Sequence, residues 1–315
     1  MTAEQLNRLI DILAPLTLFE MMVAIGLGVT FADLANVGRN GRLVVRAAFA
    51  NYVCYPAFAV GLLLAFHVDP WVAAGFLIAA VCPGAPYGPP FTGLARGNVV
   101  VAVGLMVLLA GSSALVAPAL LSVLLPVTSG TETLHLDAGR LVSTLLVTQF
   151  LPLCIGLAVR RWWPALADKL SRPASRLSGL LNVALLVAIL VAQFDTLAGI
   201  PARAFVGMSA LVLAGVVTGW LFGGPARDIR TAMAMATAVR NVGLSLVIAT
   251  ASFPGSRAVT AATTFAIFQT IAVALIALGW GRLEPALNEG KASQTPSAER
   301  RTNSSASCGN GDSSL

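Results

Sequence analysis

The sequence predicts an all-α polytopic membrane protein with about nine transmembrane helices. The first observation behind this prediction is compositional: 57% of the 315 residues are hydrophobic, only 11% are charged, and the mean hydropathy is +0.82. An ordinary soluble domain has roughly 25% charged residues, and a soluble chain of this size cannot hide so much apolar surface. The composition therefore excludes a soluble enzyme, a nucleic-acid-binding protein and a secreted disulfide scaffold.

The second observation is a series of apolar runs of the length that a bilayer requires. A hydrocarbon core of about 30 Å is crossed by about 20 helical residues. Short connections containing Gly, Pro, Asn or charged residues separate the runs, as expected for turns. The nine predicted spans are residues 11–35, 43–66, 70–92, 98–125, 139–160, 174–196, 203–223, 228–252 and 257–281.

The two ends of the chain differ in character. The run at 11–35 is too long for the apolar part of a signal peptide. It also lacks a basic flank, because Glu4 and Asp11 offset Arg8, so we interpret it as a permanent helix. Residues 285–315 have few large apolar side chains and many Ser, Asn and Gly residues, which predicts a disordered tail after a transmembrane domain of residues 11–284.

The basic residues predict the orientation in the membrane. Nine spans place the termini on opposite sides, and the side richer in Lys and Arg is the cytoplasmic one. Fifteen of the 20 basic residues fall on the side of the C-terminus and four on the other side, while Arg240 lies inside a span. We therefore expect an integral protein of the plasma (inner) membrane, with residues 1–10 extracytoplasmic and residues 285–315 cytoplasmic.

Two of the predicted spans are interrupted. In the third span, residues 82–90 read CPGAPYGPP, and their four prolines and two glycines prevent a continuous helix. In the eighth span, Asn241 and Gly243 follow Arg240 near the middle of the apolar run. An arginine at this depth costs about 3 kcal/mol on insertion scales, so it needs a partner or a polar cavity. The alternatives are a simple proline kink and an Arg240 that only caps carbonyl groups.

The spacing of the two breaks predicts an inverted-repeat secondary transporter with two broken, crossing helices. The breaks lie five spans apart, and an odd offset gives two repeats opposite orientations in the membrane. Interrupted segments at corresponding places in two halves are the best sequence indication of a binding site near the midplane. With nine spans, one repeat lacks a helix, most simply the one before residue 11.

Three segments carry a resemblance to a known family. Residues 82–98, CPGAPYGPPFTGLARGN, resemble the CPGG…LA(K/R)G(D/N) segment of the bile acid:sodium symporter family. Residues 237–249, TAVRNVGLSLVIA, resemble its second crossover segment, and residues 16–34 are similar to its first helix. The resemblance covers residues 11 to 282.

This resemblance implies a fold and an activity. The family fold has a core, here residues 43–125 and 203–281, and a panel, here residues 11–35 and 139–196. It implies that substrate binds between core and panel and crosses the membrane by alternating access. The implied substrates are small organic anions, either bile-acid-like molecules or carboxylates.

The sequence departs from the family at its sodium-binding positions. Aligning residues 241–244 with the family motif puts Ala236 where the family has a sodium-binding Glu and Arg240 where it has Gln. Gly88 and Pro89 stand where the family has a Ser-Asn pair. Hard cations such as sodium prefer oxygen ligands, so these changes would dismantle both sodium sites. We hypothesise that Arg240 replaces the coupling cation and that transport is sodium-independent.

Glu20 is a second charged group in an apolar span. It is interpreted as the counter-ion of Arg240 or as a titrating group that couples transport to protons, with a solvated carboxylate near the outer interface as the alternative. Three further polar residues are candidates because their spans pack around the crossover in the family fold: Ser112, Ser113 and Gln269. The candidate substrate- or ion-binding residues are Arg240, Asn241, Thr237, Gly84, Tyr87, Gly88, Glu20, Ser112, Ser113 and Gln269.

Other classes of function have less support. No His lies in a span, and HExxH and GxSxG motifs are absent, so we expect no catalytic residues and no enzyme activity. The four cysteines have no CxxC spacing, which predicts no metal site. We expect no cofactor, with sodium left open. The expected partners are an organic anion and the lipid bilayer but no nucleic acid, and the oligomeric state is open. A proton- or sodium-coupled symporter that uses Glu20, and a non-transporting membrane sensor on the same fold, are the alternatives.

Overall fold

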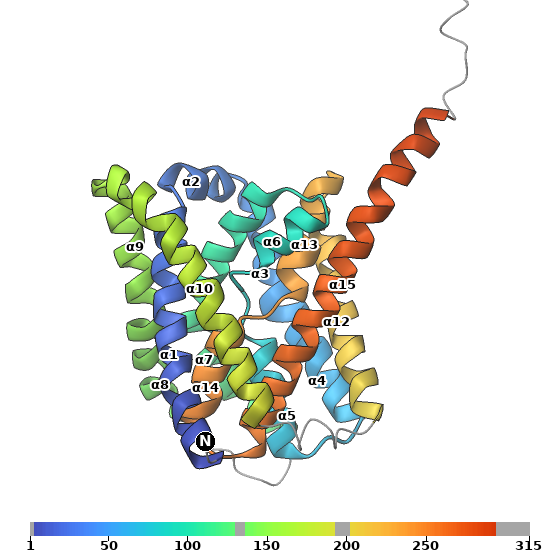
Figure 1. Cartoon of the computed structure of the whole chain (residues 1–315). Helices are drawn as coiled ribbons and strands as arrows, with labels where there is room; N and C mark the ends of the chain where they lie inside the picture. The colour runs from blue at the N-terminus through green and yellow to red at the C-terminus, as the bar shows by residue number, and fades with distance from the viewer. Residues whose placement is uncertain (1–2, 130–135, 193–201, 294–315) are drawn as a thin grey trace, which may run out of the picture.

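The computed structural model of the protein describes residues 3–129, 136–192 and 202–293. Within these residues every regular element is a helix, and the long helices lie side by side from one end of the molecule to the other (Figure 1). The predicted all-α polytopic fold is confirmed, whereas the count of nine spans stays a prediction. Seven helical segments of the described chain are long and apolar enough to cross a membrane: Arg8–Gly28, Gly41–Ala65, Val99–Thr128, Ala138–Trp162, Arg203–Phe222, Arg227–Ser252 and Arg257–Leu283.

The first span ends earlier than the sequence predicted. α1 (Ala3–Gly28) stops before Thr30, and a separate helix, α2 (Phe31–Arg39), follows it. The Thr30 hydroxyl accepts a hydrogen bond from the Asp33 N–H, and the Asp33 carboxylate accepts one from the Thr30 N–H. This reciprocal capping box satisfies two free amides and starts a new helix. The predicted boundary at residue 35 is therefore wrong.

Two spans change their helical pitch directly before a proline. A π-helical turn precedes Pro56 in the second span and Pro152 in the fifth. Proline lacks an N–H donor and its ring clashes with the carbonyl one turn back, and the wider π turn relieves this conflict. Such turns often occur at functional sites. The elements are α3 (Gly41–Phe49), η1 (Ala50–Cys54), α4 (Tyr55–Ala65), α8 (Ala138–Leu145), η2 (Leu146–Phe150) and α9 (Leu151–Trp162).

The third and eighth spans are both broken, as predicted. Residues 81–87 separate α5 (Pro70–Ala80) from α6 (Gly88–Leu94), and residues 239–241 separate α13 (Arg227–Ala238) from α14 (Val242–Ser252). The two breaks meet, because the Asn241 N–H donates a 2.8 Å hydrogen bond to the Cys82 carbonyl. α6 and α13 lie toward one end of the molecule, and α5 and α14 toward the other (Figure 1).

Of the remaining helices, α12 (Ala202–Phe222) has the length of its predicted span, and α7 (Val99–Ser129), α10 (Pro164–Ala192) and α15 (Arg257–Ser293) are longer than theirs. α7 and α12 lie close to the predicted boundaries. α10 makes the predicted connection before residue 174 helical, and residues 193–196 of that span lie outside the described residues. α15 is helical beyond the predicted start of the tail at residue 285, and residues 294–315 lie outside the described part.

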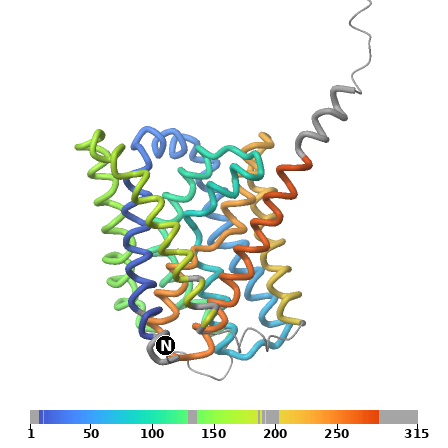
Figure 2. The backbone as a smooth tube through the Cα atoms, viewed as in Figure 1, coloured from blue at the N-terminus to red at the C-terminus, as the bar shows by residue number. Residues whose placement is uncertain are grey.

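The helices pack in two groups. α1 lies along α9 and α10, which belong to the predicted panel (Figure 2). In the predicted core, α12 packs on α13, α15 packs on α5, and α7 contacts α5 and α6. α1 also contacts α14, and α7 contacts η2, so the two groups touch beside the crossing of the broken helices. α2, which contains residues 31–35 of the predicted panel, packs on α7 instead.

The contact between α1 and α9 depends on two glycines. A Cβ atom at Gly156 would lie 2.4 Å from the Val23 carbonyl oxygen and 2.8 Å from the Gly26 Cα atom. Small residues allow two membrane helices to approach this closely.

We expect Gly156→Ala to destabilise the protein by about 1–3 kcal/mol, the usual effect of overpacking. Gly179→Ala in α10 is the matched control, because a Cβ atom there meets nothing within 4 Å. Thermal unfolding in a mild detergent should give a lower Tm for the first variant and an unchanged or slightly higher Tm for the second. Equal Tm values would contradict the proposed close contact.

Candidate functional site

The crossing of the two breaks is held by hydrogen bonds between residues 82–87 and residues 240–242. The Tyr87 hydroxyl donates to the Arg240 carbonyl at 2.8 Å and accepts from the Val242 N–H at 3.4 Å. The Asn241 side-chain amide donates to the Gly84 carbonyl at 3.4 Å. Each broken segment therefore satisfies polar groups that the other leaves free, as hydrocarbon surroundings require.

Gln269 of α15 contacts both backbone groups of Arg240. Its side-chain oxygen accepts from the Arg240 N–H at 3.1 Å, and its side-chain nitrogen donates to the Arg240 carbonyl at 3.0 Å. Gln269 is 1% exposed. The Gln269 side chain thus satisfies both backbone hydrogen-bonding groups of one unwound residue and fixes the position of that residue beside α15.

The Arg240 side chain is fully buried at the break. Its guanidinium carbon lies 3.7 Å from the centroid of the Tyr55 ring, and its Nη2 atom donates to the Thr237 carbonyl at the end of α13. A desolvated cation over an aromatic face gains about 2 kcal/mol or more, and a helix C-terminus favours positive charge. Among the described residues, no carboxylate pairs with Arg240, and its Nε and Nη1 atoms have no hydrogen-bond partner.

The π-helical turn η1 adds polar groups that the sequence analysis missed. The fully buried Asn51 side chain donates to the Thr237 hydroxyl at 3.2 Å, and the Tyr52 hydroxyl shares a 2.8 Å hydrogen bond with Ser112. Tyr55, which faces Arg240, begins the next helix. The signal in the sequence was an Asn and two Tyr residues close before Pro56 in an otherwise apolar run.

Ser113 connects the two groups of helices. The buried Gln149 side chain of η2 donates to the Ser113 hydroxyl at 2.9 Å and also to the Ala110 carbonyl of α7. The Gln149 oxygen has no partner within the described chain. This contact joins the predicted panel to the predicted core close to the crossover.

The glycines of the first break line a very small void. Gly84 and Gly88 surround it together with Ala236, Val239 and other residues, and its volume is about 10 Å³. A space of this size holds one water molecule at most. The two predicted site residues Gly84 and Gly88 therefore line a void that has no room for an organic anion in this conformation.

Glu20 lies apart from the other candidates. Its half-buried carboxylate accepts a hydrogen bond from the Ser178 hydroxyl of α10. No ion pair joins Glu20 to Arg240 in the part of the chain that the structure describes. The predicted counter-ion is therefore wrong for this conformation, because the Glu20 side chain interacts with α10 rather than with the crossover.

This arrangement predicts the outcome of a charge swap. Glu20→Arg combined with Arg240→Glu should transport no better than Arg240→Glu alone, because the two side chains do not interact. Solute uptake into proteoliposomes measures this, with Glu20→Gln as the control for the carboxylate alone. Recovery of uptake in the double variant would show an ion pair in another conformation.

Two interrupted helices that cross within a bundle of membrane-spanning helices are typical of a secondary transporter. The sequence model of the Sodium Bile acid symporter family matches residues 15–200, and the chain belongs to this family. Members of this family are transporters rather than enzymes. The matched region contains the first break and ends before the second, so Arg240 lies beyond it.

Two curated relatives carry names that mention sodium. The chain is 25% identical over 281 residues to a Bacillus subtilis (strain 168) protein named "Uncharacterized sodium-dependent transporter YocS". The aligned region covers 85% of this chain and 83% of the relative. It is also 25% identical over 173 residues to the "Probable sodium/metabolite cotransporter BASS2, chloroplastic" of Oryza sativa subsp. japonica, covering 55% of this chain and 40% of the relative. The binding roles of the ten candidate residues stay predictions.

Proposed function

We propose that the protein transports small organic anions, bile-acid-like molecules or carboxylates, without sodium, and that the Arg240 guanidinium replaces the coupling cation. The observation that carries this proposal is the fully buried guanidinium at the second break, which lies over Tyr55 and caps α13. A coupling sodium would supply a removable positive charge at a helix break. Arg240 supplies a permanent one.

Electrostatics supports the absence of sodium coupling. Like charges repel strongly in a protein interior, because the effective dielectric constant is well below that of water. The position that carries a carboxylate in the family is Ala236 here, which lines the small void beside Gly84 and Gly88. A sodium ion at the crossover would therefore meet a fixed cation and, among the described residues, no compensating carboxylate.

The closed crossover implies that the substrate binds beside it. The void of about 10 Å³ is too small for an organic anion, so we place the substrate between the proposed core and panel, where Gln149 contacts Ser113. Movement of the core against the panel would break this hydrogen bond and alternate access to the site. The excess of basic residues on the C-terminal side favours a cytoplasmic C-terminus in the inner membrane.

A sodium-coupled symporter is the second candidate, and the printed names of the two relatives favour it. Uptake of radiolabelled taurocholate and pyruvate into proteoliposomes distinguishes the two. Equal uptake under inward sodium and choline gradients is the expected result, with protein-free liposomes as the control. Saturable, cooperative dependence on sodium would contradict the proposal, whereas dependence on a proton gradient would favour coupling through Glu20. Binding without uptake would favour a sensor.

A further inference from the structure

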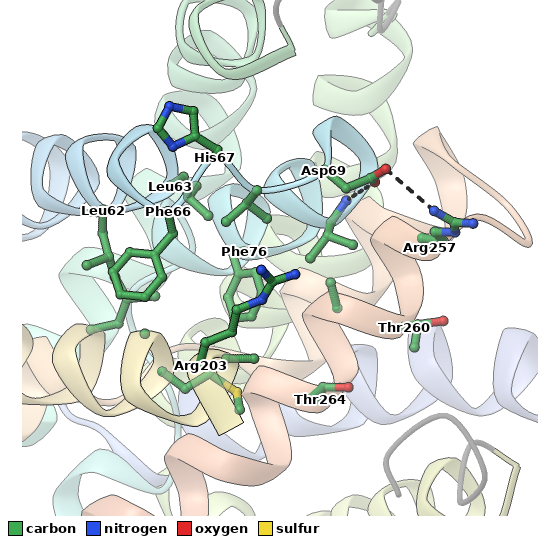
Figure 3. A pocket seen from close by; sticks show the side chains of 17 residues that line it. Leu62, Leu63, Phe66, His67, Asp69, Phe76, Arg203, Arg257, Thr260 and Thr264 are labelled. Carbon is green, nitrogen blue, oxygen red and sulfur yellow. Dashed lines mark hydrogen bonds and ion pairs between the residues drawn. The ribbon is translucent and has the colours of Figure 1, made fainter. Parts of the chain in front are cut away.

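A second concave site lies away from the crossover. A cavity of about 430 Å³ opens between the C-terminal end of α4 and the N-terminal ends of α5, α12 and α15 (Figure 3). These helix ends lie at the same end of the molecule as the start of α1 (Figure 1). None of the ten predicted site residues lines this cavity. Its volume falls in the range of about 300–1,000 Å³ that is usual for small-molecule sites.

The described walls of this cavity are mostly apolar. Phe66, which directly follows α4, and Phe76 of α5 face it, and the buried side chains of Met208 and Leu211 line it from α12. The Phe76 ring packs edge-on against the fully buried Phe265, at 5.6 Å between centroids. This contact anchors one wall in the protein interior, so the apolar surface is a preformed part of the fold.

The charged groups among the described lining residues leave an excess of positive charge. Arg203, at the start of α12, extends across the cavity toward Phe76 (Figure 3). Within the described residues it forms no hydrogen bond or ion pair. Arg257, at the rim, lies 3.5 Å from the Asp69 carboxylate. Among the described residues that line the cavity, two guanidinium groups therefore face one carboxylate, and the exposed Arg203, which has no partner there, extends over the apolar wall.

We propose that this cavity binds a single-chain amphipathic anion of the alkyl carboxylate class. The carboxylate would pair with the Arg203 guanidinium, whose planar donors match its two oxygens, and the alkyl chain would lie between Phe66, Phe76 and Leu211. One unpaired cation beside an apolar wall fits a ligand with one charged head and one chain. This site is separate from the proposed transport site, because its described lining includes neither the crossover residues nor Ser113 and Gln149, beside which the transported substrate is placed.

Binding of radiolabelled dodecanoate to the purified full-length protein tests the proposal. Scintillation proximity in a nonionic detergent gives the affinity, and competition with dodecanol, the neutral analogue, isolates the contribution of the charge. Arg203→Gln should weaken dodecanoate binding about tenfold, as expected for the loss of one charge-assisted contact. The affinity for dodecanol, measured by competition, should stay unchanged.

Two glycine variants distinguish the effect of filling the cavity from general effects on the protein. A Cβ atom at Gly207, which lines the cavity, and one at Gly179 in α10 both meet nothing within 4 Å. Gly207→Leu should fill the cavity and abolish dodecanoate binding, while Gly179→Leu should bind as the wild type does, and both should keep their Tm.

Three results would overturn the proposal. The first is wild-type dodecanoate affinity in Gly207→Leu, and the second is an equal loss in Gly179→Leu. The third is a combination of two findings. A two-chain phospholipid co-purifies with the wild type but not with Gly207→Leu, as detected by native mass spectrometry, and the delipidated wild type binds no dodecanoate. None of these measurements depends on uptake, so they stand whether or not the proposed transport function is correct.

Discussion

Ala236→Glu combined with Arg240→Gln is expected to make uptake depend on sodium. The double change places the family's carboxylate and amide at the second break and removes the guanidinium that lies over Tyr55. The local charge becomes more negative by two units, which favours a bound cation in a region of low dielectric constant. Gly88 and Pro89 still lack the oxygen ligands of the family's Ser-Asn pair, so we expect low sodium affinity.

The expected result is an uptake about tenfold higher under a sodium gradient than under a choline gradient, which corresponds to about 1.4 kcal/mol of coupling. The wild type should show equal uptake in the two gradients. Tm values of the detergent-solubilised variants establish that both are folded. Sodium-independent uptake by a folded double variant would contradict the role that we give to these two positions.

The single variants separate the two contributions. Arg240→Gln alone removes the cation and leaves the Thr237 carbonyl and the Tyr55 ring without their charged partner. We therefore expect its uptake to fall at least about tenfold in either gradient. Ala236→Glu alone would neutralise Arg240 with a neighbouring carboxylate and should remain insensitive to sodium. If Arg240→Gln transports like the wild type, the guanidinium has only a structural role.

Gly84→Ala is expected to destabilise the fold strongly, because Gly84 combines an unusual backbone conformation with a close contact. Its φ angle is +85°, and a Cβ atom there would lie 2.4 Å from the Ala110 backbone nitrogen of α7. Left-handed conformation costs an L-residue about 1–2 kcal/mol, and overpacking adds about 1–3 kcal/mol. The combined loss of about 2–5 kcal/mol is a large part of the stability of a typical domain.

Gly88→Ala is the matched control for this prediction. Gly88 begins α6, only four residues after Gly84, and a Cβ atom there meets nothing within 4 Å. Thermal unfolding in detergent should show a large decrease in Tm, or no folded protein, for Gly84→Ala and a Tm close to the wild type for Gly88→Ala. Similar Tm values would mean that the first break relaxes more easily than this packing implies.

Features that depend on neighbouring residues were predictable from the sequence. The four prolines and two glycines of residues 82–90 prevent a helix wherever they occur, and the structure has its first break there. The capping box of Thr30 and Asp33 was equally visible, but the apolar residues around it led to a single span over 11–35. The π turns before Pro56 and Pro152 also have a local cause.

Features that depend on distant segments were less predictable. The interaction of Glu20 with Ser178, rather than with Arg240, follows from the packing of α1 on α10. Asn51 and Thr237 are 186 residues apart and share a hydrogen bond. Neither contact has a spacing that a single sequence reveals.

By itself, the sequence determined that this is a membrane protein of helices with two breaks, because apolar length, proline and glycine act through local backbone chemistry. It also placed one arginine, Arg240, in the second break. Only the tertiary structure decided what surrounds that arginine: the Tyr55 ring, the Thr237 carbonyl and the amide of Gln269. A buried charge takes its partners from whichever helices pack against it, and α4, α13 and α15 meet there only when the whole bundle has assembled.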